Sequence, residues 1–423
     1  MGILSILTIN SIHQRIFKQS ASKEMNHFIK DLSWSIFGGG ISNIFAFILL
    51  VVVARILGPQ NFGQYNSLLS FAAGISVIFL LGVNVGSIRF LSDTEYRLKQ
   101  REIFTASLVL SLLQSVIVTI ILLYLHYFVQ VKLFSDLTFL LGLLFAFILS
   151  FKNLFDSYLR AFNFIVQQSF LRIAEILITF ASFMVISFVI GEISYISLLI
   201  AFIIGSTCFI FYSAFILFNK LSRFTLKEVS LLINYNKVLI ISLVGTFILS
   251  MDKFFIGKFI GIKELGVYSA YYSLSFLIMS TLGSILMNVF WPATIKNKES
   301  LKEIARKMRV LFIKVLPFWF IGISLFMTSM IPFFGRDYRF SIILIILFSL
   351  SSYSLLVYNV FLSFLSINSI KSSAVFVSIS ALILVSTILI FKDIKIYLFS
   401  QILIYGICSK IFFSKIILEK KGK

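Results

Sequence analysis

Six ionisable residues of this chain lie inside long hydrophobic stretches, where charge is costly. They are Arg89, Arg172, Glu175, Asp252, Lys253 and Lys314. A charged side chain at the centre of a bilayer costs about 2.5–3.5 kcal/mol even on insertion scales, so such groups normally face a protein interior or a water-filled cavity. Four of the six are cations and two are anions. This positive excess predicts a cavity that binds an anionic ligand, with Arg89, Arg172, Lys253 and Lys314 as its cations.

Four of these residues also have a structural interpretation. Arg89 and Lys314 lie close enough to the predicted inner interface for their charged ends to reach water while the stems stay in lipid. Arg172 and Glu175 are three residues apart on one predicted helix face, within reach of each other as an ion pair. The sequence leaves the structural and the functional interpretation open for all four.

Asp252 and Lys253 lie far from the predicted inner interface, which favours a functional role. Neighbours along a helix point about 100° apart, so these two side chains are not expected to face each other. We therefore predict that Asp252 pairs with a cation on another helix. In this interpretation Asp252, together with Glu175, serves coupling or gating.

The composition predicts the elements that must position these charges. Hydrophobic residues make up 59% of the chain and charged residues 13%, with a mean hydropathy of +1.02. An ordinary soluble domain has about 25% charged residues. A bilayer core about 30 Å thick needs roughly 20 apolar residues per helix. Such segments occur at 32–54, 68–90, 103–125, 137–158, 166–190, 195–218, 238–257, 267–291, 310–331, 340–365, 372–391 and 396–417. We predict an all-α integral membrane protein with about twelve transmembrane helices.

A short motif occurs twice, directly after the first and the seventh segment. Residues 55–65 (RILGPQNFGQY) and 258–268 (KFIGIKELGVY) share a basic residue, an apolar pair, Gly, four residues, Gly, one residue and Tyr. Six segments fit between the copies, and duplication of an even number of spans keeps their orientation, with an axis along the membrane normal. We therefore predict two six-helix lobes around a central cavity. The equivalent structural positions are Gly58, Gly63 and Tyr65 in the first lobe and Gly261, Gly266 and Tyr268 in the second.

The segments divide the chain into a tail (1–27), a first lobe (28–218), a linker (219–237), a second lobe (238–418) and a basic tail (419–423). Most of the 37 Lys and Arg residues lie on the side of the N-terminus, so both termini and the linker are predicted to be cytoplasmic. This topology and contact with anionic lipids account for the net charge of +20, and no nucleic acid partner is needed. No metal-ligand spacing, nucleophile–base pair or phosphate-binding loop is present, so we predict no catalytic residue, metal or cofactor.

The chain resembles bacterial polysaccharide-unit flippases of the Wzx type, within the multidrug/oligosaccharidyl-lipid/polysaccharide exporter superfamily, over about residues 26–418. The resemblance rests on residues 32–35 (LSWS), on the first copy of the repeated motif, and on residues 252–259 (DKFFIGKF) leading to 265–269 (LGVYS). It implies two six-helix lobes around a central cavity. It also implies movement of undecaprenyl-pyrophosphate-linked repeat units of O-antigen or another surface polysaccharide across the bacterial cytoplasmic (inner) membrane.

The resemblance implies further roles and partners. Family members use cavity cations for the anionic lipid-linked sugar, a role that Arg89, Arg172, Lys253 and Lys314 match by chemistry and depth. The implied partners are the lipid-linked oligosaccharide, membrane lipids, a polysaccharide polymerase and chain-length proteins. The sequence does not choose between a proton, a sodium ion and the substrate gradient alone as the driving force.

Three other functions are alternatives. A small-molecule or drug exporter of the same superfamily needs interior carboxylates for cationic drugs, and here only Asp252 and Glu175 lie deep, each beside a cation. A membrane glycosyltransferase or polysaccharide polymerase usually needs a sizeable outer loop with catalytic groups, whereas the outer loops predicted here are short. A flippase for cell-wall precursors commonly carries spans beyond twelve.

Overall fold

The computed structural model describes residues 23–130, 134–189, 191, 193–296, 298–368 and 370–418. All regular secondary structure within these residues is helical. The predicted basic tail 419–423, and all but the last five residues of the predicted N-terminal tail 1–27, lie outside the described residues.

The described residues of the N-terminal part of the chain contain six α-helices. They are α2 (Lys23–Leu80), α3 (Val83–Ser92), α4 (Gln100–Tyr127), α5 (Asp136–Ala161), α6 (Ile165–Met184), extended by a π-helical turn at Val185–Val189, and α7 (Tyr195–Leu217). A 3₁₀ turn at Thr94–Lys99 joins α3 to α4. Ser194 forms a capping box at the start of α7, which fixes where this helix begins after the connection.

The C-terminal part contains the remaining helices. They are α8 (Leu226–Ser250), α9 (Asp252–Phe259), α10 (Ile262–Lys296), α11 (Lys298–Met330), α12 (Ile342–Asn368), α13 (Ile370–Phe391) and α14 (Ile394–Leu418). Thr225 and Glu228 form a capping box that starts α8. Residues 226–237, which the sequence analysis placed in a linker, are therefore the first turns of α8.

Helix α2 consists of two arms joined at Gly58. Gly58 has φ 66° and ψ 171°, a backbone conformation open to glycine but strained for other residues, and Pro59 follows it as the first residue of the second arm. A second break at Leu81–Gly82 separates α3 from this arm. With α2 counted as two arms, α3 as the end of the second arm, and α8 with α9 as one span, the helices follow the twelve predicted segments in order. The predicted all-α membrane fold is confirmed.

Length and hydropathy alone identify nine membrane-spanning helices in the described part of the chain, or ten when the bent α8 is included. This count is below twelve because it takes the two arms of α2 together and does not include α10. Helix α8 bends by 73° between its first part, Leu226–Lys237, and its second part, Ser242–Ser250.

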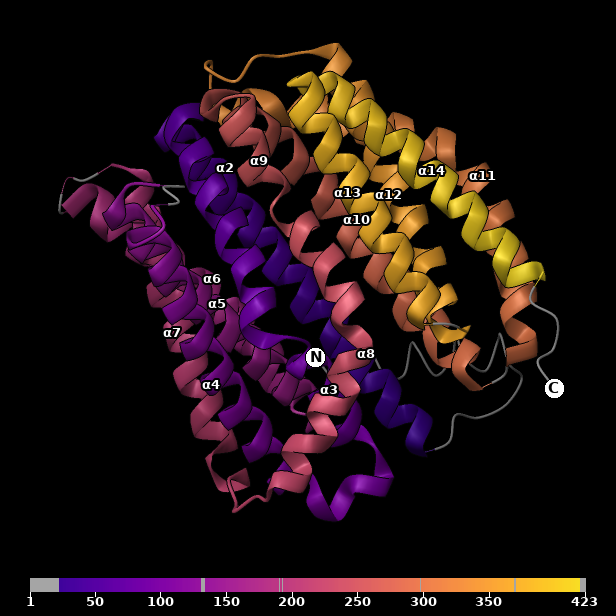
Figure 1. The fold of residues 1–423 in the computed structure, drawn as a ribbon. Helices are drawn as coiled ribbons and strands as arrows, with labels where there is room; N and C mark the ends of the chain where they lie inside the picture. Colours follow the sequence, from indigo (N-terminus) through magenta and orange to yellow (C-terminus); the bar gives the residue numbers. More distant parts are fainter. Residues whose placement is uncertain are drawn as a thin grey trace.

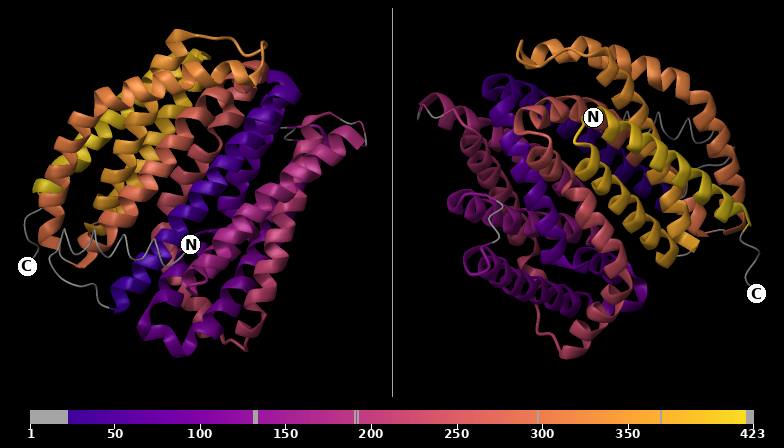
Figure 2. Two further views of the ribbon diagram at one scale, coloured as in Figure 1. Left: turned by 180° about the vertical axis from the view of Figure 1, so that it is seen from behind. Right: turned by 45° about the horizontal axis from the view of Figure 1, so that its top comes forward.

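The helices form two lobes (Figure 1). Helices α4 to α7 lie on one side, α10 to α14 lie on the other, and α2 and α8 run between them (Figures 1 and 2). The largest buried hydrophobic cluster joins the arms of α2 around Gly58 to α10, α11, α12 and α14. We call the end of the molecule at which the two arms of α2 meet the Gly58 end. The opposite end, where α3 meets α4, is the Asp93 end.

The two copies of the repeated motif contact each other at the Gly58 end. A Cβ atom added to Gly63 would lie 2.0 Å from the carbonyl oxygen of Ile262, and one added to Gly266 would lie 1.9 Å from that of Pro59. The two contacts are reciprocal, because Ile262 and Gly266 follow Pro59 and Gly63 by the same 203 residues (262 − 59). A twofold relation between the lobes produces such a pair of contacts. We call residues 59–63 with 262–266 the glycine crossing.

The motif tyrosines occupy matching surroundings. Tyr65 is buried and stacks on Phe202 of α7, with ring centroids 5.5 Å apart. Tyr268 is buried and packs on Tyr397 of α14, at 6.2 Å. Helices α7 and α14 are the sixth spans of their respective halves, so each tyrosine packs on the last helix of its own half.

Candidate functional site

A cavity of about 640 Å³ lies between the two lobes and contains the acidic–basic pair singled out in the sequence. Its volume is within the range of about 300–1,000 Å³ that is usual for ligand sites. Its walls come from α2 on one side and from α8, α9, α10, α12 and α13 on the other. Asp252 and Lys253 are the charged residues of its described lining. This confirms the expectation of a central cavity.

The pair lies at a break between two helices. Helix α8 ends at Ser250 and α9 begins at Asp252, with Met251 between them at φ −93° and ψ 7°. The hydroxyl of Ser70 on α2 donates to the carbonyl oxygen of Ser250 at 2.6 Å and accepts from the backbone N–H of Phe254 at 3.2 Å. A side chain of the N-terminal half thus satisfies backbone groups on both sides of the break.

Asp252 is held by the start of α9 and by a tyrosine. Its Oδ1 accepts from the backbone N–H of Lys253 at 2.6 Å, and its Oδ2 accepts from the hydroxyl of Tyr397 on α14 at 3.4 Å. The positive end of the helix dipole also favours a carboxylate in the first turn. The prediction of a cation on another helix as the partner of Asp252 is wrong for the described residues. The backbone N–H of Lys253 and the hydroxyl of Tyr397 bind the carboxylate instead.

Lys253 contacts a different helix from Asp252, as their adjacent positions predicted. Its ammonium lies 4.3 Å from the ring centroid of Tyr272 on α10. That ring is part of a stack with Tyr268 and Phe276, with centroids 5.8 and 5.2 Å apart. Lys253 forms no ion pair with any residue that the structure describes. The cavity therefore contains a cation that an aromatic face stabilises and that forms no direct ion pair, with the carboxylate of Asp252 near enough to attract it.

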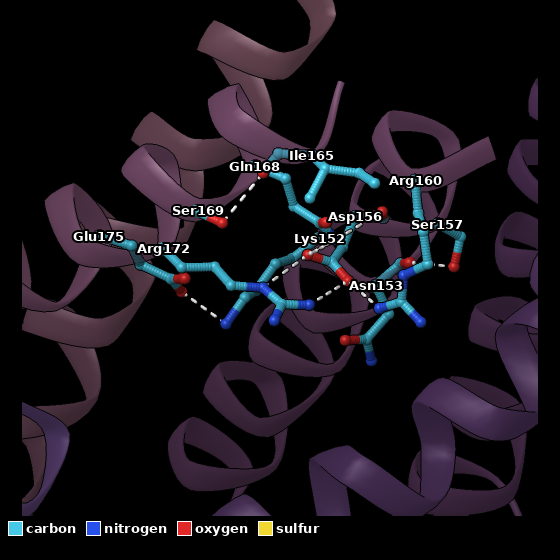
Figure 3. A network of polar contacts seen from close by, with 10 residues as sticks. All are labelled: Lys152, Asn153, Asp156, Ser157, Arg160, Ile165, Gln168, Ser169, Arg172 and Glu175. Atoms are coloured by element: carbon cyan, nitrogen blue, oxygen red, sulfur yellow. Dashed lines mark hydrogen bonds and ion pairs between the residues drawn. The ribbon is translucent and has the colours of Figure 1, made fainter. Parts of the chain in front are cut away.

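Arg172 binds a carboxylate on the neighbouring helix and not Glu175 (Figure 3). Its Nε and Nη2 donate to Asp156 of α5 at 3.0 and 2.7 Å, a bidentate geometry that is strong and directional. Gln168 and Arg160 bind the same carboxylate at 2.8 and 3.1 Å. The alternative in which Arg172 and Glu175 form a pair is therefore wrong, because α5 packs beside α6 and offers a better-placed carboxylate.

Glu175 has its own partners. It is buried, and its Oε1 lies 2.7 Å from Nζ of Lys152 on α5 and accepts from the hydroxyl of Ser206 on α7 at 2.9 Å. These contacts and those of Arg172 link α5 to α6 (Figure 3), and the hydroxyl of Ser206 links Glu175 to α7. Glu175 lines a separate cavity of about 490 Å³ between α6 and α7. The geometry supports a structural role for the network, and its role in coupling stays a prediction.

The other two predicted cations lie outside the Asp252 cavity. Arg89 is exposed on α3, with its guanidinium 5.1 Å from the ring centroid of Tyr235 on α8. Lys314 is exposed on α11. Of the four predicted cavity cations, the structure brings only Lys253 to the described lining of this cavity, and the substrate role of Arg89, Arg172 and Lys314 stays a prediction.

Sequence reasoning missed three residues of this site. Tyr272 could have been found, because Tyr268, Tyr272 and Phe276 are four residues apart and so share one helix face. Tyr397 and Ser70 carry no such signal, since their partners lie 145 and 180 residues away along the chain. In the part of the chain that the structure describes, no three His, Cys, Asp or Glu side chains gather as a metal site requires.

Solved membrane transporters share this fold. A MATE transporter of Vibrio cholerae has a TM-score of 0.61 at 13% identity, covering 93% of this chain and 97% of that one. An outward-facing multidrug resistance MATE family transporter of the MOP superfamily has 0.60 at 14%, covering 91% and 94%. A MOP superfamily transporter from Pyrococcus furiosus, described as having a binding pocket of reversed polarity, has 0.58 at 13%, covering 91% and 94%. The chain thus has the fold of a multi-pass membrane transporter.

The sequence also matches a family model. The model described as "Polysaccharide biosynthesis protein" matches residues 28–298, and the chain belongs to this family. No curated protein sequence matches the chain. The predicted resemblance to polysaccharide exporters of the MOP superfamily is confirmed.

Proposed function

We propose that this protein is a flippase for an anionic, lipid-linked oligosaccharide. In this proposal it moves undecaprenyl-pyrophosphate-linked repeat units of O-antigen or another surface polysaccharide from the inner to the outer leaflet of the bacterial cytoplasmic membrane. The observation that carries the proposal is the ammonium of Lys253, which lines the cavity between the lobes and forms no direct ion pair with a described residue. Membership of the polysaccharide biosynthesis family and the transporter fold support it.

The proposed transport path is physically reasonable. A bare hydroxyl moved into hydrocarbon costs roughly 2–7 kcal/mol, so an oligosaccharide needs a wet, polar route. The cavity supplies polar groups on both walls, with Ser70 on α2 and Thr246 and Asn359 opposite. The prenyl tail stays in lipid, and rocking of the lobes changes the end at which the cavity opens. Asp252 then serves coupling, because its contact with Tyr397 joins α9 to α14.

The proposal also includes an orientation. The Gly58 end faces outward and the Asp93 end faces the cytoplasm, as the distribution of Lys and Arg predicted. A polymerase and chain-length proteins would then receive the repeat unit at the Gly58 end.

A cationic small-molecule exporter is the second candidate, because Asp252 lines the same cavity. Two contacts favour the anionic substrate. The carboxylate of Asp252 already accepts from Tyr397 and from the start of α9. The face of Tyr272, where an organic cation would bind, is already covered by Lys253. A cationic drug would have to displace a like charge, whereas a phosphate would be attracted to it.

Complementation tests the proposal. In a strain that lacks its own repeat-unit flippase, the wild-type protein should restore surface polysaccharide, and Lys253→Ala should lower it at unchanged membrane abundance. Lys253→Arg should retain more activity than Lys253→Ala because the charge is kept. Lys227→Ala, an exposed position on the first turn of α8, is the matched control.

Two outcomes would contradict the proposal. The first is normal polysaccharide with Lys253→Ala at normal abundance. The second is no restoration by the wild-type protein, together with resistance to cationic drugs that Asp252→Asn abolishes. The second outcome would favour the small-molecule exporter.

A further inference from the structure

The break between α8 and α9 has an identifiable cause. In a continuous helix the carbonyl oxygen of Ser250 would accept directly from the N–H of Phe254, four residues later. Here the hydroxyl of Ser70 lies between these two groups, donating to the first at 2.6 Å and accepting from the second at 3.2 Å. A side chain inserted into the helical hydrogen-bond ladder is a known cause of a sharp kink.

The hydrogen bonding of Ser70 differs from that of two other buried serines on these helices. A buried helical serine usually donates to a carbonyl oxygen three or four residues earlier in its own helix. Ser76 on the same arm of α2 does so, donating to Ala73 at 2.7 Å, and Ser87 on α3 donates to Val83 at 2.6 Å. Ser70 is also buried, but it donates across the interface between the lobes.

The same face of α2 also positions Met251 at the break. One turn beyond Ser70, a Cβ atom added to Gly74 would lie 2.5 Å from Cγ of Met251. Met251 is buried in a cluster with Phe71 and Ile75 of α2. The turn that carries Asp252 and Lys253 is therefore shaped by contacts from the opposite lobe.

We propose that Ser70 is a positioning residue for the substrate cavity. Its inserted hydroxyl keeps the helix turned at Met251, and this turn directs Lys253 into the cavity. When the lobes separate at Ser70, its hydrogen bonds to Ser250 and Phe254 are lost. The carbonyl oxygen of Ser250 then accepts directly from the N–H of Phe254, and Lys253 turns out of the cavity. This inference rests on the proposed function, in which Lys253 binds the anionic group of the substrate and must later release it.

The test measures the position of residue 253 without measuring transport. Cys208 and Cys408, the two cysteines of the chain, are replaced by Ala, and Lys253→Cys is introduced as a reporter. Its labelling rate with a water-soluble maleimide is measured in membranes. Ser70→Ala should lower this rate at least threefold, because the helix closes and residue 253 leaves the cavity. Ser70→Thr, which keeps the hydroxyl, should stay within twofold of the parent.

Two controls separate positioning from loss of structure. Ser76→Ala removes a buried hydroxyl from the same arm whose hydrogen bond, among the residues that the structure describes, lies within its own helix, and it should leave the rate unchanged. An Asn359→Cys reporter on the exposed cavity wall of α12 should label equally in the Ser70 and Ser70→Ala backgrounds if the cavity persists.

An unchanged or increased labelling rate at position 253 in Ser70→Ala would overturn the inference. The result is independent of the complementation assay, so failure of the proposed function alone would leave the labelling pattern intact. Success of complementation with unchanged labelling would reject only the role of Ser70.

Discussion

Replacing Gly266 by Ala at the glycine crossing should favour the conformation in which the lobes separate at the Gly58 end. The added Cβ would lie 1.9 Å from the carbonyl oxygen of Pro59 and 2.9 Å from its Cα. Ordinary contact begins at 3.4 Å, so the two helices must move apart by about 1.5 Å (3.4 − 1.9). Both opposing atoms belong to the backbone and have no rotamer through which to yield.

The size of the effect follows from the cost of overpacking. Extra methyl groups in a well-packed contact typically cost about 1–3 kcal/mol. If the open arrangement relieves that strain, its population relative to the closed one rises by about 5–150-fold. Gly63→Ala should act in the same way, because its Cβ meets Ile262 in the reciprocal contact. The double variant should fall short of additivity, since either Cβ already parts the same pair of helices.

Accessibility of a shielded position measures this shift. Ser67 is 3% exposed and lies beside Gly257 of α9, where a Cβ atom would be 3.3 Å from its Oγ. With the two native cysteines replaced, Ser67→Cys should react with a membrane-impermeant maleimide at least fivefold faster when Gly266 is Ala. Gly322→Ala on α11, which has no neighbouring atom within 4 Å, is the control. An unchanged rate at normal membrane abundance would refute the argument that the crossing closes this end.

Three further outcomes are expected. Reporter fusions at Lys263 should lie outside the cytoplasm and fusions at Lys227 inside it, and the reverse would reject the proposed orientation. Asp252→Asn should lower surface polysaccharide more than membrane abundance, because it removes the charge but keeps the shape; equal losses would assign it a structural role. Asp156→Ala should lower the unfolding temperature in detergent by removing the bidentate partner of Arg172, at a cost of about 1.5–3 kcal/mol for lost hydrogen bonds to a charged group; an unchanged unfolding temperature would show that the network does not stabilise the lobe.

The helical segments and their order could be predicted from the sequence because each depends on local hydrophobicity. The turn at Gly58 lies in the first copy of the repeated motif, between the first two predicted segments, and the motif pointed to equivalent positions in both halves. The break at Met251 could not be predicted in the same way. Its cause is the hydroxyl of Ser70, 180 residues earlier in the chain, and serine is common throughout these helices.

The partners of the charged residues were the hardest part to predict. Spacing within one helix made Arg172 and Glu175 neighbours, and it gave no information about how α5 would dock beside them. Lys152 and Asp156, four residues apart on that helix, present a cation and an anion that match the other pair in reverse order. Which residue pairs with Arg172 and which with Glu175 depends on how α5 packs against α6.

The glycine crossing gives a reason why so little of the repeated motif is identical between the two copies. Each glycine meets a carbonyl oxygen, and every amino acid supplies the same carbonyl oxygen. Pro59 and Ile262 can therefore differ completely in their side chains and still present the same surface to the opposite helix. The three identities among eleven positions are two glycines and a tyrosine. A contact made through the main chain leaves the two halves free to diverge around it, so the geometry of an ancestral duplication can persist after most of its sequence has changed.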